Sequence, residues 1–569
     1  MKKKIFSIAA IISAFSITGH SAFAATRYAA DDLVNLGRAL LGEIEFSEGQ
    51  DVNGDNVINV FDIIKMRESF MNTGEFEEQT IAISRNNTKY IGRNIYDENN
   101  ITWLIHSGSA VEFNVNAKSA EISINGDSNI KNGDNYRPRY AVIVDDEIIL
   151  DELLSEKEKT VTLFEGSTSR NAVVKVIHLS EANNGAVGVS SIKVDSDAAV
   201  PVTPTAKKEL SIEFIGDSIT CAYGVEGENQ YEGFKTSTEN FMKSYAYLTA
   251  KQLDADYSAV SYSGHGIVSG YSSSGDAETG SLVPDYYDYV GKNGSYKIPW
   301  DFSAQENDVV VINLGTNDNT YCSKDYEVRG EEYAEKYAEF LAHVHEMNPE
   351  AYIICTVGTM GCSEMYPYIE KAVAAFKAET GYERIMSYLS QTQSQADGYG
   401  SDWHPSPVTQ QNSAYVLADK ICQALGMESS QIGLNVAADA EYSSTYDNGA
   451  NMSAYFSDWD HSYHITTVTG GSNKEDIQAL VSGIDIKKSG NYRLSFKIEA
   501  GSGTEIPFVI RSKSTGDIIF EDTFVGKGEK TLFEKEFESP VTADSELVFM
   551  LGGTDNLRMS LYDVKVVKY

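Results

Sequence analysis

Hydrophobic and polar positions change their period along this chain of 569 residues. Between residues 80 and 194, apolar and polar side chains alternate, as at 110–115 and 141–144, and Gly, Asn and Asp separate the runs. Alternation with a period of two places one face of a strand against a core. We therefore predict a small β-sandwich over residues 76–200.

The pattern changes class after a short Pro- and Thr-rich linker at 200–205. Continuous apolar runs at 212–215, 309–314 and 352–357 read as buried strands, and amphipathic helices separate them. This alternation is typical of a mostly parallel sheet flanked by helices, which we place at 201–428. Two apolar stripes mark the helices: Tyr337, Phe340, Leu341 and Val344, and then Tyr415, Leu417, Ala418, Ile421 and Leu425.

Short strands return at the end of the chain and predict a second β-sandwich over 429–569. They are expected at 492–498, 508–512, 547–551 and 561–567. The expected fold is therefore multidomain, with an α/β domain between two β-sandwiches.

The first 24 residues have the features of a secretory signal peptide: Lys2, Lys3 and Lys4, then an apolar run, then Ala22-Phe23-Ala24. No later apolar run is long enough to span a bilayer, so we expect a secreted, soluble protein without a membrane span. The formal net charge of -37 argues against nucleic-acid binding, which needs clustered Lys and Arg. The five cysteines have no disulfide-framework spacing and are interpreted as core residues.

Residues 25–75 contain a candidate calcium loop followed by a short helical pattern. Oxygen donors recur at loop positions 1, 3, 5, 9 and 12, with a backbone carbonyl at position 7, which suits a hard cation of high coordination number. The residues in question are Asp51, Asn53, Asp55, Val57 (carbonyl), Asn59 and Asp62. The alternative is an Asp- and Asn-rich surface loop.

This loop resembles that of a type I dockerin, a module that plugs into a cohesin of a cellulosomal scaffoldin. Residues 32–42 resemble the helix of a first dockerin repeat, but the loop before it would run back into the signal peptide. The resemblance therefore implies one structural calcium site, a truncated module, and a candidate association with a cohesin and the cellulosome.

Three segments carry the candidate chemistry. Gly216-Asp217-Ser218 ends a buried strand and presents a serine on a tight turn at the strand's carboxyl end, where open α/β sheets keep their sites. Two later segments contain Asn317 and His404. Together they supply a nucleophile, an amide donor and a base. The Gly-x-Ser-x-Gly elbow of α/β-hydrolases is absent from the sequence.

The ordered blocks around Ser218, Gly264, Asn317 and His404 resemble those of SGNH (GDSL-like) hydrolases, and more closely carbohydrate esterase family 2. That resemblance covers about residues 85–426 and implies removal of acetyl groups from plant cell-wall polysaccharide, acetylated xylan or glucomannan. A serine needs an adjacent base, which His404 supplies. The N–H groups of Ser218 and Gly264 and the Asn317 amide are the expected oxyanion donors, and no cofactor is expected for catalysis.

Two residues beside His404 complete the candidate site. Asp402 is two residues ahead of His404, whereas the usual SGNH block places the aspartate three ahead. If Pro405 holds this segment extended, the two side chains project from one face about 6–7 Å apart. A backbone carbonyl is then the alternative partner of His404. Trp403 is a candidate sugar platform or a packed aromatic, and activity is expected to fall below pH ~6.5 as His404 is protonated.

Other functions stay open on the sequence alone. A different esterase or lipase would share every catalytic block and differ in the depth of its acyl pocket. A non-catalytic sugar-binding protein would be inert to serine-directed reagents. The last domain resembles a jelly-roll carbohydrate-binding module, for which a purely stabilising appendage is the alternative.

Overall fold

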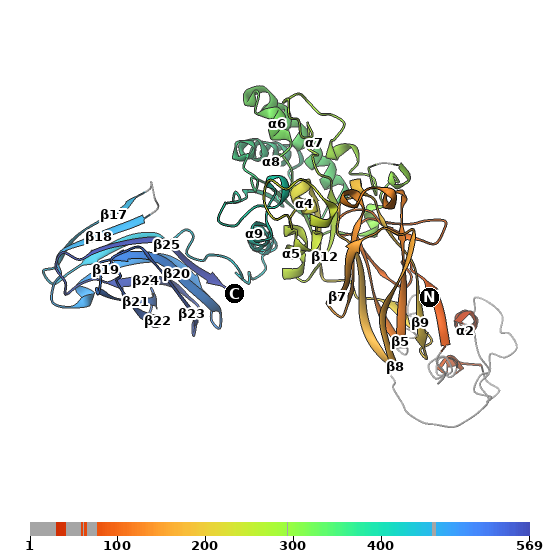
Figure 1. Ribbon diagram of the computed structural model, residues 1–569, viewed down its shortest axis with the longest axis horizontal. Coiled ribbons are helices and arrows are strands. Elements are labelled where there is room, and N and C mark those ends of the chain that lie inside the picture. Colours follow the sequence, from red (N-terminus) through yellow and green to blue (C-terminus); the bar gives the residue numbers. More distant parts are fainter. Residues whose placement is uncertain are drawn as a thin grey trace.

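The computed structural model describes residues 30–40, 58–60, 62–64, 66, 77–292, 294–457 and 462–569. Three bodies follow one another along the chain in Figure 1: a β-sandwich, an α/β domain with helices around its sheet, and a second β-sandwich near the C-terminus. The predicted order of β, α/β and β regions is therefore confirmed.

The first sandwich is an antiparallel sheet folded around one core. Strand β5 pairs with β2 and β10 along its first half and with β9 along its second. Its pairing with β8 shifts register between Ala117 and Ser119. Its inward residues alternate with polar ones, as the sequence pattern predicts. The strands are β1 (Glu77–Ala82), β2 (Lys89–Ile91), β3 (Asn94–Tyr96), β4 (Thr102–Leu104), β5 (Ala110–Gly126), β6 (Arg139–Val144), β7 (Glu147–Leu153), β8 (Glu158–His178), β9 (Val187–Ser196) and β10 (Val202–Pro204).

The α/β domain has a parallel sheet in the order β12-β11-β13-β14-β15, so β11, the strand that precedes Ser218, lies between β12 and β13. The strands are β11 (Leu210–Gly216), β12 (Ala255–Ser261), β13 (Val309–Asn313), β14 (Tyr352–Val357) and β15 (Ile385–Leu389). The helices are α4 (Ser218–Cys221), α5 (Tyr245–Gln252), α6 (Asp318–Cys322), α7 (Glu331–Met347), α8 (Tyr366–Thr380) and α9 (Pro407–Leu425).

Each face of this sheet has its own core. Val309 and Val311 of β13 pack with α5 and α9, whereas Val310 and Ile312 of the same strand pack with α7 and α8. A strand covered on both faces has no polar side, which is why these strands read as continuous apolar runs. The predicted stripe on α7 faces the second of these cores, and Leu417, Ile421 and Leu425 of the stripe on α9 face the first.

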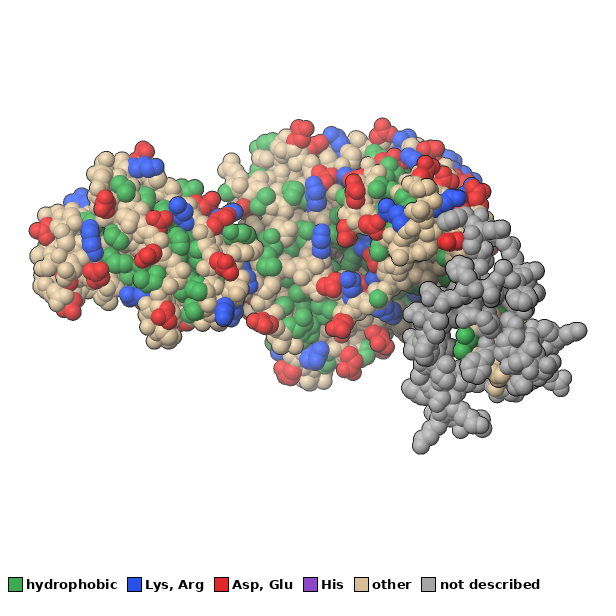
Figure 2. All heavy atoms as spheres, turned by 90° about the horizontal axis from the view of Figure 1, so that it is seen from below, with side chains coloured by type: hydrophobic (Ala, Val, Ile, Leu, Met, Phe, Trp, Pro, Cys, Tyr) green, Lys and Arg blue, Asp and Glu red, His purple; other side chains and the backbone are tan. Residues whose placement is uncertain are grey.

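The last body is a sandwich of two antiparallel sheets, β16-β19-β24-β21-β22 and β17-β18-β25-β20-β23, over a core rich in Phe, Ile and Leu. Acidic and basic side chains are interspersed over the face seen in Figure 2. The strands are β16 (Glu441–Tyr446), β17 (Asn451–Ser457), β18 (Ser462–Thr469), β19 (Ile477–Ile486), β20 (Asn491–Ala500), β21 (Glu505–Ser512), β22 (Ile518–Val525), β23 (Thr531–Glu538), β24 (Ala543–Met550) and β25 (Arg558–Lys568).

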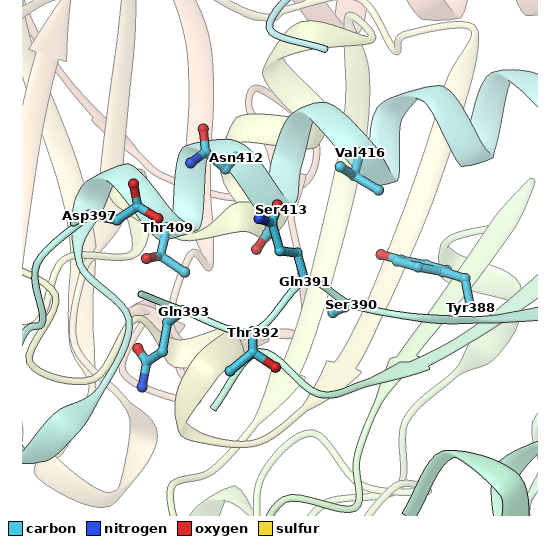
Figure 3. A pocket seen from close by; sticks show the side chains of 10 residues that line it. All are labelled: Tyr388, Ser390, Gln391, Thr392, Gln393, Asp397, Thr409, Asn412, Ser413 and Val416. Atoms are coloured by element: carbon cyan, nitrogen blue, oxygen red, sulfur yellow. The ribbon is translucent and has the colours of Figure 1, made fainter. Parts of the chain in front are cut away.

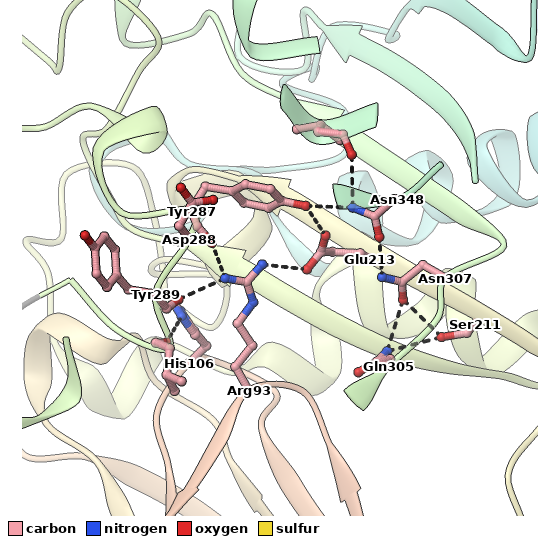
Figure 4. A network of polar contacts seen from close by, with 12 residues as sticks. Arg93, His106, Ser211, Glu213, Tyr287, Asp288, Tyr289, Gln305, Asn307 and Asn348 are labelled. Atoms are coloured by element: carbon pink, nitrogen blue, oxygen red, sulfur yellow. Dashed lines mark hydrogen bonds and ion pairs between the residues drawn. The ribbon is translucent and has the colours of Figure 1, made fainter. Parts of the chain in front are cut away.

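A buried ion pair joins the first sandwich to the parallel sheet of the α/β domain (Figure 4). Arg93 of the sandwich donates to Glu213 of β11 at 3.0 Å, and both side chains are almost fully buried. The hydroxyl of Tyr287 donates to the other oxygen of Glu213 at 2.6 Å, and Arg93 also donates to the carbonyl of Tyr289 at 2.9 Å. Strand β11, which leads into Ser218, is therefore tied to the preceding domain.

Of the N-terminal predictions, only part can be placed. The signal peptide (1–24) and the candidate calcium ligands Asp51, Asn53, Asp55 and Val57 lie outside the described residues. Helix α2 (Ala30–Leu40) occupies the segment compared with a first dockerin helix. The carboxylate of Asp62 accepts the backbone N–H of Asn59 at 2.7 Å. All five cysteines are free, and among the described helices none is long and apolar enough to cross a membrane.

Candidate active site

Ser218 lies where β11 stops and α4 begins. Asp217 caps this helix, because its carboxylate accepts the N–H of Ile219 at 3.0 Å. Gly216 has no room for a side chain, since a Cβ there would lie 2.1 Å from the Thr220 hydroxyl. The turn thus fixes Ser218 at the carboxyl end of a central parallel strand.

The two other strand ends carry the predicted oxyanion donors. Gly264 follows β12 with a φ of +80°, and Asn317 follows β13 as the N-terminal cap of the α6 turn. Because β12 and β13 flank β11, their carboxyl ends bring Gly264 and Asn317 to either side of Ser218. Within the described chain, the N–H groups of Ser218 and Gly264 carry no hydrogen bond.

Asn317 holds this arrangement together. Its side-chain amide donates to the Asp217 carboxylate at 3.1 Å and to the backbone carbonyl of His265 at 2.8 Å. Both amide hydrogens are therefore engaged here, so an oxyanion would have to share one of them with Asp217 or His265. Burial raises the pKa of Asp217 to about 7, which weakens its hold on that hydrogen at neutral pH.

Asp318, the next residue, braces the glycine block. Its carboxylate accepts the N–H groups of Ile267, Val268 and Ser269 at 2.9, 2.7 and 3.1 Å. Asp318 therefore fixes the loop that follows Gly264. Burial raises its pKa to about 6.

His404 is oriented by the backbone. Its Nδ1 lies 3.2 Å from the Ser401 carbonyl and 3.1 Å from the Asp402 carbonyl, so Nδ1 carries the proton and Nε2 is left as the acceptor. The ring of Tyr223 packs on the imidazole with 4.2 Å between centroids. Burial lowers the pKa of His404 to about 4, so the ring is a neutral base over a wider range than the expected limit of pH ~6.5 implies.

The side chain of Asp402 points elsewhere. Its carboxylate accepts the hydroxyl of Tyr223 at 2.8 Å. His404 is extended, as Pro405 predicts, but Asp402 (φ 49°) and Trp403 (φ 64°) are left-handed. The expectation of an extended Asp402–His404 segment is therefore wrong, and the carboxylate is not the Nδ1 partner. Tyr223 was missed because a lone tyrosine after a short helix gives no periodic signal.

Trp403 is an exposed aromatic beside the base. Its side chain is 47% exposed, and it meets Tyr231 edge-on at 5.8 Å and Tyr399 at 5.2 Å. An exposed indole steadied by two tyrosines suits stacking on a sugar ring rather than a packed core.

A small cavity lies next to the His404 loop but is not the acyl site (Figure 3). It holds about 20 Å³, enough for a single water molecule. Gln393, one of its lining residues, donates to the Trp403 carbonyl at 2.7 Å and so supports the loop.

Three family models match successive parts of the chain. Residues 90–204 match the carbohydrate esterase 2 N-terminal family, and residues 443–556 match a carbohydrate binding domain. Residues 214–411 match the GDSL-like lipase/acylhydrolase family, and this range includes Ser218, Gly264, Asn317 and His404. The central domain is therefore similar to GDSL-like acylhydrolases. The family predicted from the sequence is thereby supported in both the first sandwich and the α/β domain.

Two curated proteins similar in sequence to this chain carry esterase names. The chain is 31% identical over 341 residues to "Cellulase/esterase CelE" of Acetivibrio thermocellus, a match covering 59% of this chain but only 39% of that protein. It is 25% identical over 268 residues to "Acetylxylan esterase / glucomannan deacetylase" of Cellvibrio japonicus, covering 47% of this chain and 70% of that one.

A solved structure aligns with the same region. It is a family two carbohydrate esterase from Clostridium thermocellum in complex with cellohexaose, with 29% identity and a TM-score of 0.52. The alignment covers 60% of this chain and 99% of that one.

Proposed function

We propose that this protein is a secreted serine esterase that removes acetyl groups from plant cell-wall polysaccharide, acetylated xylan or glucomannan, through an acyl-enzyme. The proposal is carried by the position of Ser218, Gly264 and Asn317 at three adjacent strand ends. The backbone-oriented ring of His404 packs on Tyr223, whose N–H donates to the Ser218 carbonyl. The polysaccharide is suggested by the names of the relatives from Cellvibrio japonicus and Clostridium thermocellum.

The chemistry follows from these groups. Ser218 Oγ attacks the acetyl carbonyl carbon while its proton passes to His404 Nε2, and the C=O electrons move onto the oxygen. The N–H groups of Ser218 and Gly264 and the Asn317 amide hold that oxyanion. The C–O bond to the sugar then breaks, and His404 returns the proton to the departing sugar hydroxyl.

Deacylation repeats these steps with water. His404 takes a proton from water while the water oxygen attacks the acetyl-Ser218 carbonyl carbon. The tetrahedral intermediate then collapses, acetate leaves, and His404 returns the proton to Ser218 Oγ. The imidazolium formed in both halves is stabilised through Nδ1–H by the two carbonyls of Ser401 and Asp402. We propose that no metal takes part, so a chelator should leave acetate release unchanged.

We also propose binding roles for Trp403 and for the two segments that flank the first sandwich and the α/β domain. Trp403 would stack on the sugar that carries the acetyl group. The last sandwich would bind polysaccharide, which the match of residues 443–556 to a carbohydrate binding domain supports. Residues 25–75 would form a truncated dockerin-like segment with one structural calcium and a cohesin partner, a proposal that proteolysis of this segment with and without calcium would test.

One substrate panel tests the proposed function. Acetate release is measured from acetylated xylan, acetylated glucomannan and a long-chain aryl ester, with Ser218→Ala as the blank. The proposal expects turnover of an acetylated polysaccharide and little of the long-chain ester. Preference for the long chain would indicate a lipase, and an inert wild type that still binds polysaccharide would indicate a binding protein.

A further inference from the structure

One buried carboxylate of the first sandwich reaches the catalytic face. Glu181 lies just after β8, at the start of the 3₁₀ turn Ala182–Asn184, and is 3% exposed. Its Oε2 accepts the backbone N–H of Ser263 at 2.8 Å. Ser263 directly precedes Gly264, so a side chain from the neighbouring domain is bonded to the oxyanion loop.

Glu181 is itself held in place. Its backbone N–H donates to the Glu239 carboxylate at 3.0 Å, and Glu239 is fully buried. The Asn183 amide donates to the same Oε2 at 3.2 Å, and the Cys221 sulfur lies 4.0 Å from it. Cys221 ends the helix that begins at Ser218, so Oε2 sits between the nucleophile helix and the oxyanion loop.

Other hydrogen bonds of this loop link the Glu181–Ser263 contact to the orientation of the Gly264 N–H. The Ser263 carbonyl accepts from His265 Nδ1 at 2.9 Å, and Lys292 meets His265 Nε2 at 2.6 Å, which leaves the ring proton on Nδ1. A peptide is planar, so fixing the Ser263 carbonyl fixes the opposite direction of the Gly264 N–H. Glu181 holds one end of residue 263 and His265 holds the other.

We propose that Glu181 is a positioning residue for the oxyanion hole: the first sandwich completes the active site by anchoring Ser263 and so aiming the Gly264 N–H. This inference rests on the proposed esterase function. It also gives the sandwich a part in catalysis, in addition to the structural tie made by Arg93.

The geometry sets the order of effects among substitutions. Glu181→Gln keeps an oxygen that accepts from Ser263 and should hold kcat within about threefold of wild type. Glu181→Asp is one methylene shorter and should be intermediate. Glu181→Met leaves the Ser263 N–H unpaired and should lower kcat about 10- to 100-fold with KM changed less than about twofold, below the 10²–10³ of losing a donor outright.

The experiment compares these variants with Glu112→Met on an acetyl ester. Glu112 is a sandwich carboxylate whose ion-pair partners are Lys89 and Lys175, so its loss weakens the same domain without touching Ser263. Kinetic constants are normalised to the folded fraction, and hydrogen exchange of residues 262–266 is measured by mass spectrometry. The inference expects faster exchange there in Glu181→Met and wild-type exchange in Glu112→Met.

Several outcomes would overturn it. One is a normalised kcat within about threefold of wild type in Glu181→Met. Another is a Glu181→Gln variant as impaired as Glu181→Met, because then the charge and not the acceptor would matter. If the Glu181→Met protein does not fold, the Gln and Asp variants decide, since equal kcat in both contradicts the reach argument. An inactive wild type would instead refute the esterase function itself.

Discussion

Replacing Asp402 separates a backbone-oriented histidine from a catalytic triad. The carboxylate bonds to Tyr223 at 2.8 Å, and the groups facing His404 Nδ1 are the carbonyls of Ser401 and Asp402, which no substitution of the side chain removes. We therefore expect Asp402→Asn to keep a kcat within about tenfold of wild type. Asn can still accept from Tyr223, and it tolerates the left-handed φ of 49°.

The size of the effect follows from what each variant loses. Asp402→Ala removes the hydrogen bond to Tyr223, worth about 1 kcal/mol, and places Ala in the left-handed region at about 1 kcal/mol more. If both energies were added in full to the activation barrier, kcat would fall about 30-fold. Asp402→Asn should lose less than about tenfold, whereas the aspartate of a true triad is worth about 10⁴-fold.

The assay is single-turnover and steady-state acetate release at pH 7, with Ser218→Ala as the floor. Far-UV circular dichroism and thermal unfolding check that each variant is folded. A loss near 10⁴ in folded Asp402→Asn would mean that the carboxylate does orient or charge-stabilise His404, and the backbone-dyad reasoning would be refuted.

Three further outcomes follow from the site and its supports. Asn317→Ala should lower kcat by about 10²–10³ with little change in KM, and a loss confined to KM would make Asn317 a substrate contact. With the pKa of His404 near 4, kcat/KM should hold down to about pH 5 and fall about tenfold per unit below pH 4; a break near 6.5 would indicate a solvated ring. Arg93→Met should destabilise the protein by about 3–5 kcal/mol in urea unfolding, because it strands Glu213. As a control, replacing the exposed Arg170 by Met should change the free energy of unfolding by less than about 1 kcal/mol.

The sequence sufficed for strands whose two faces are both buried. Every side chain of β13 is buried, so its apolar run was unmistakable. Strand β12 was not predicted, because Asp256 and Ser258 interrupt its apolar pattern. The structure explains the polar residue Asp256: β12 is the edge strand of the sheet, and Asp256 accepts a hydrogen bond from Lys89 of the first sandwich at 2.8 Å. An interdomain partner of this kind cannot be read from local periodicity.

The candidate catalytic blocks could be recognised because each is a short run of sequence. How they meet in space depends on contacts with distant parts of the chain. The left-handed pair Asp402 and Trp403 is unfavourable in isolation. It is held by long-range bonds, from the Ser401 N–H to the Gly224 carbonyl at 2.9 Å and from the Asp402 N–H to the Glu232 carbonyl at 3.0 Å. The contact of Glu181 with Ser263 likewise joins two domains, so no spacing rule pointed to it.

The most direct test of the central claim is covalent labelling of the nucleophile. Wild-type protein is incubated with a fluorophosphonate, and the modified residue is located by peptide mass spectrometry alongside acetate release from acetylated xylan and acetylated glucomannan. The account predicts one adduct per chain, on Ser218, with activity lost in step, and neither adduct nor acetate release in folded Ser218→Ala. Acetate release by Ser218→Ala at a rate near that of wild type would contradict it.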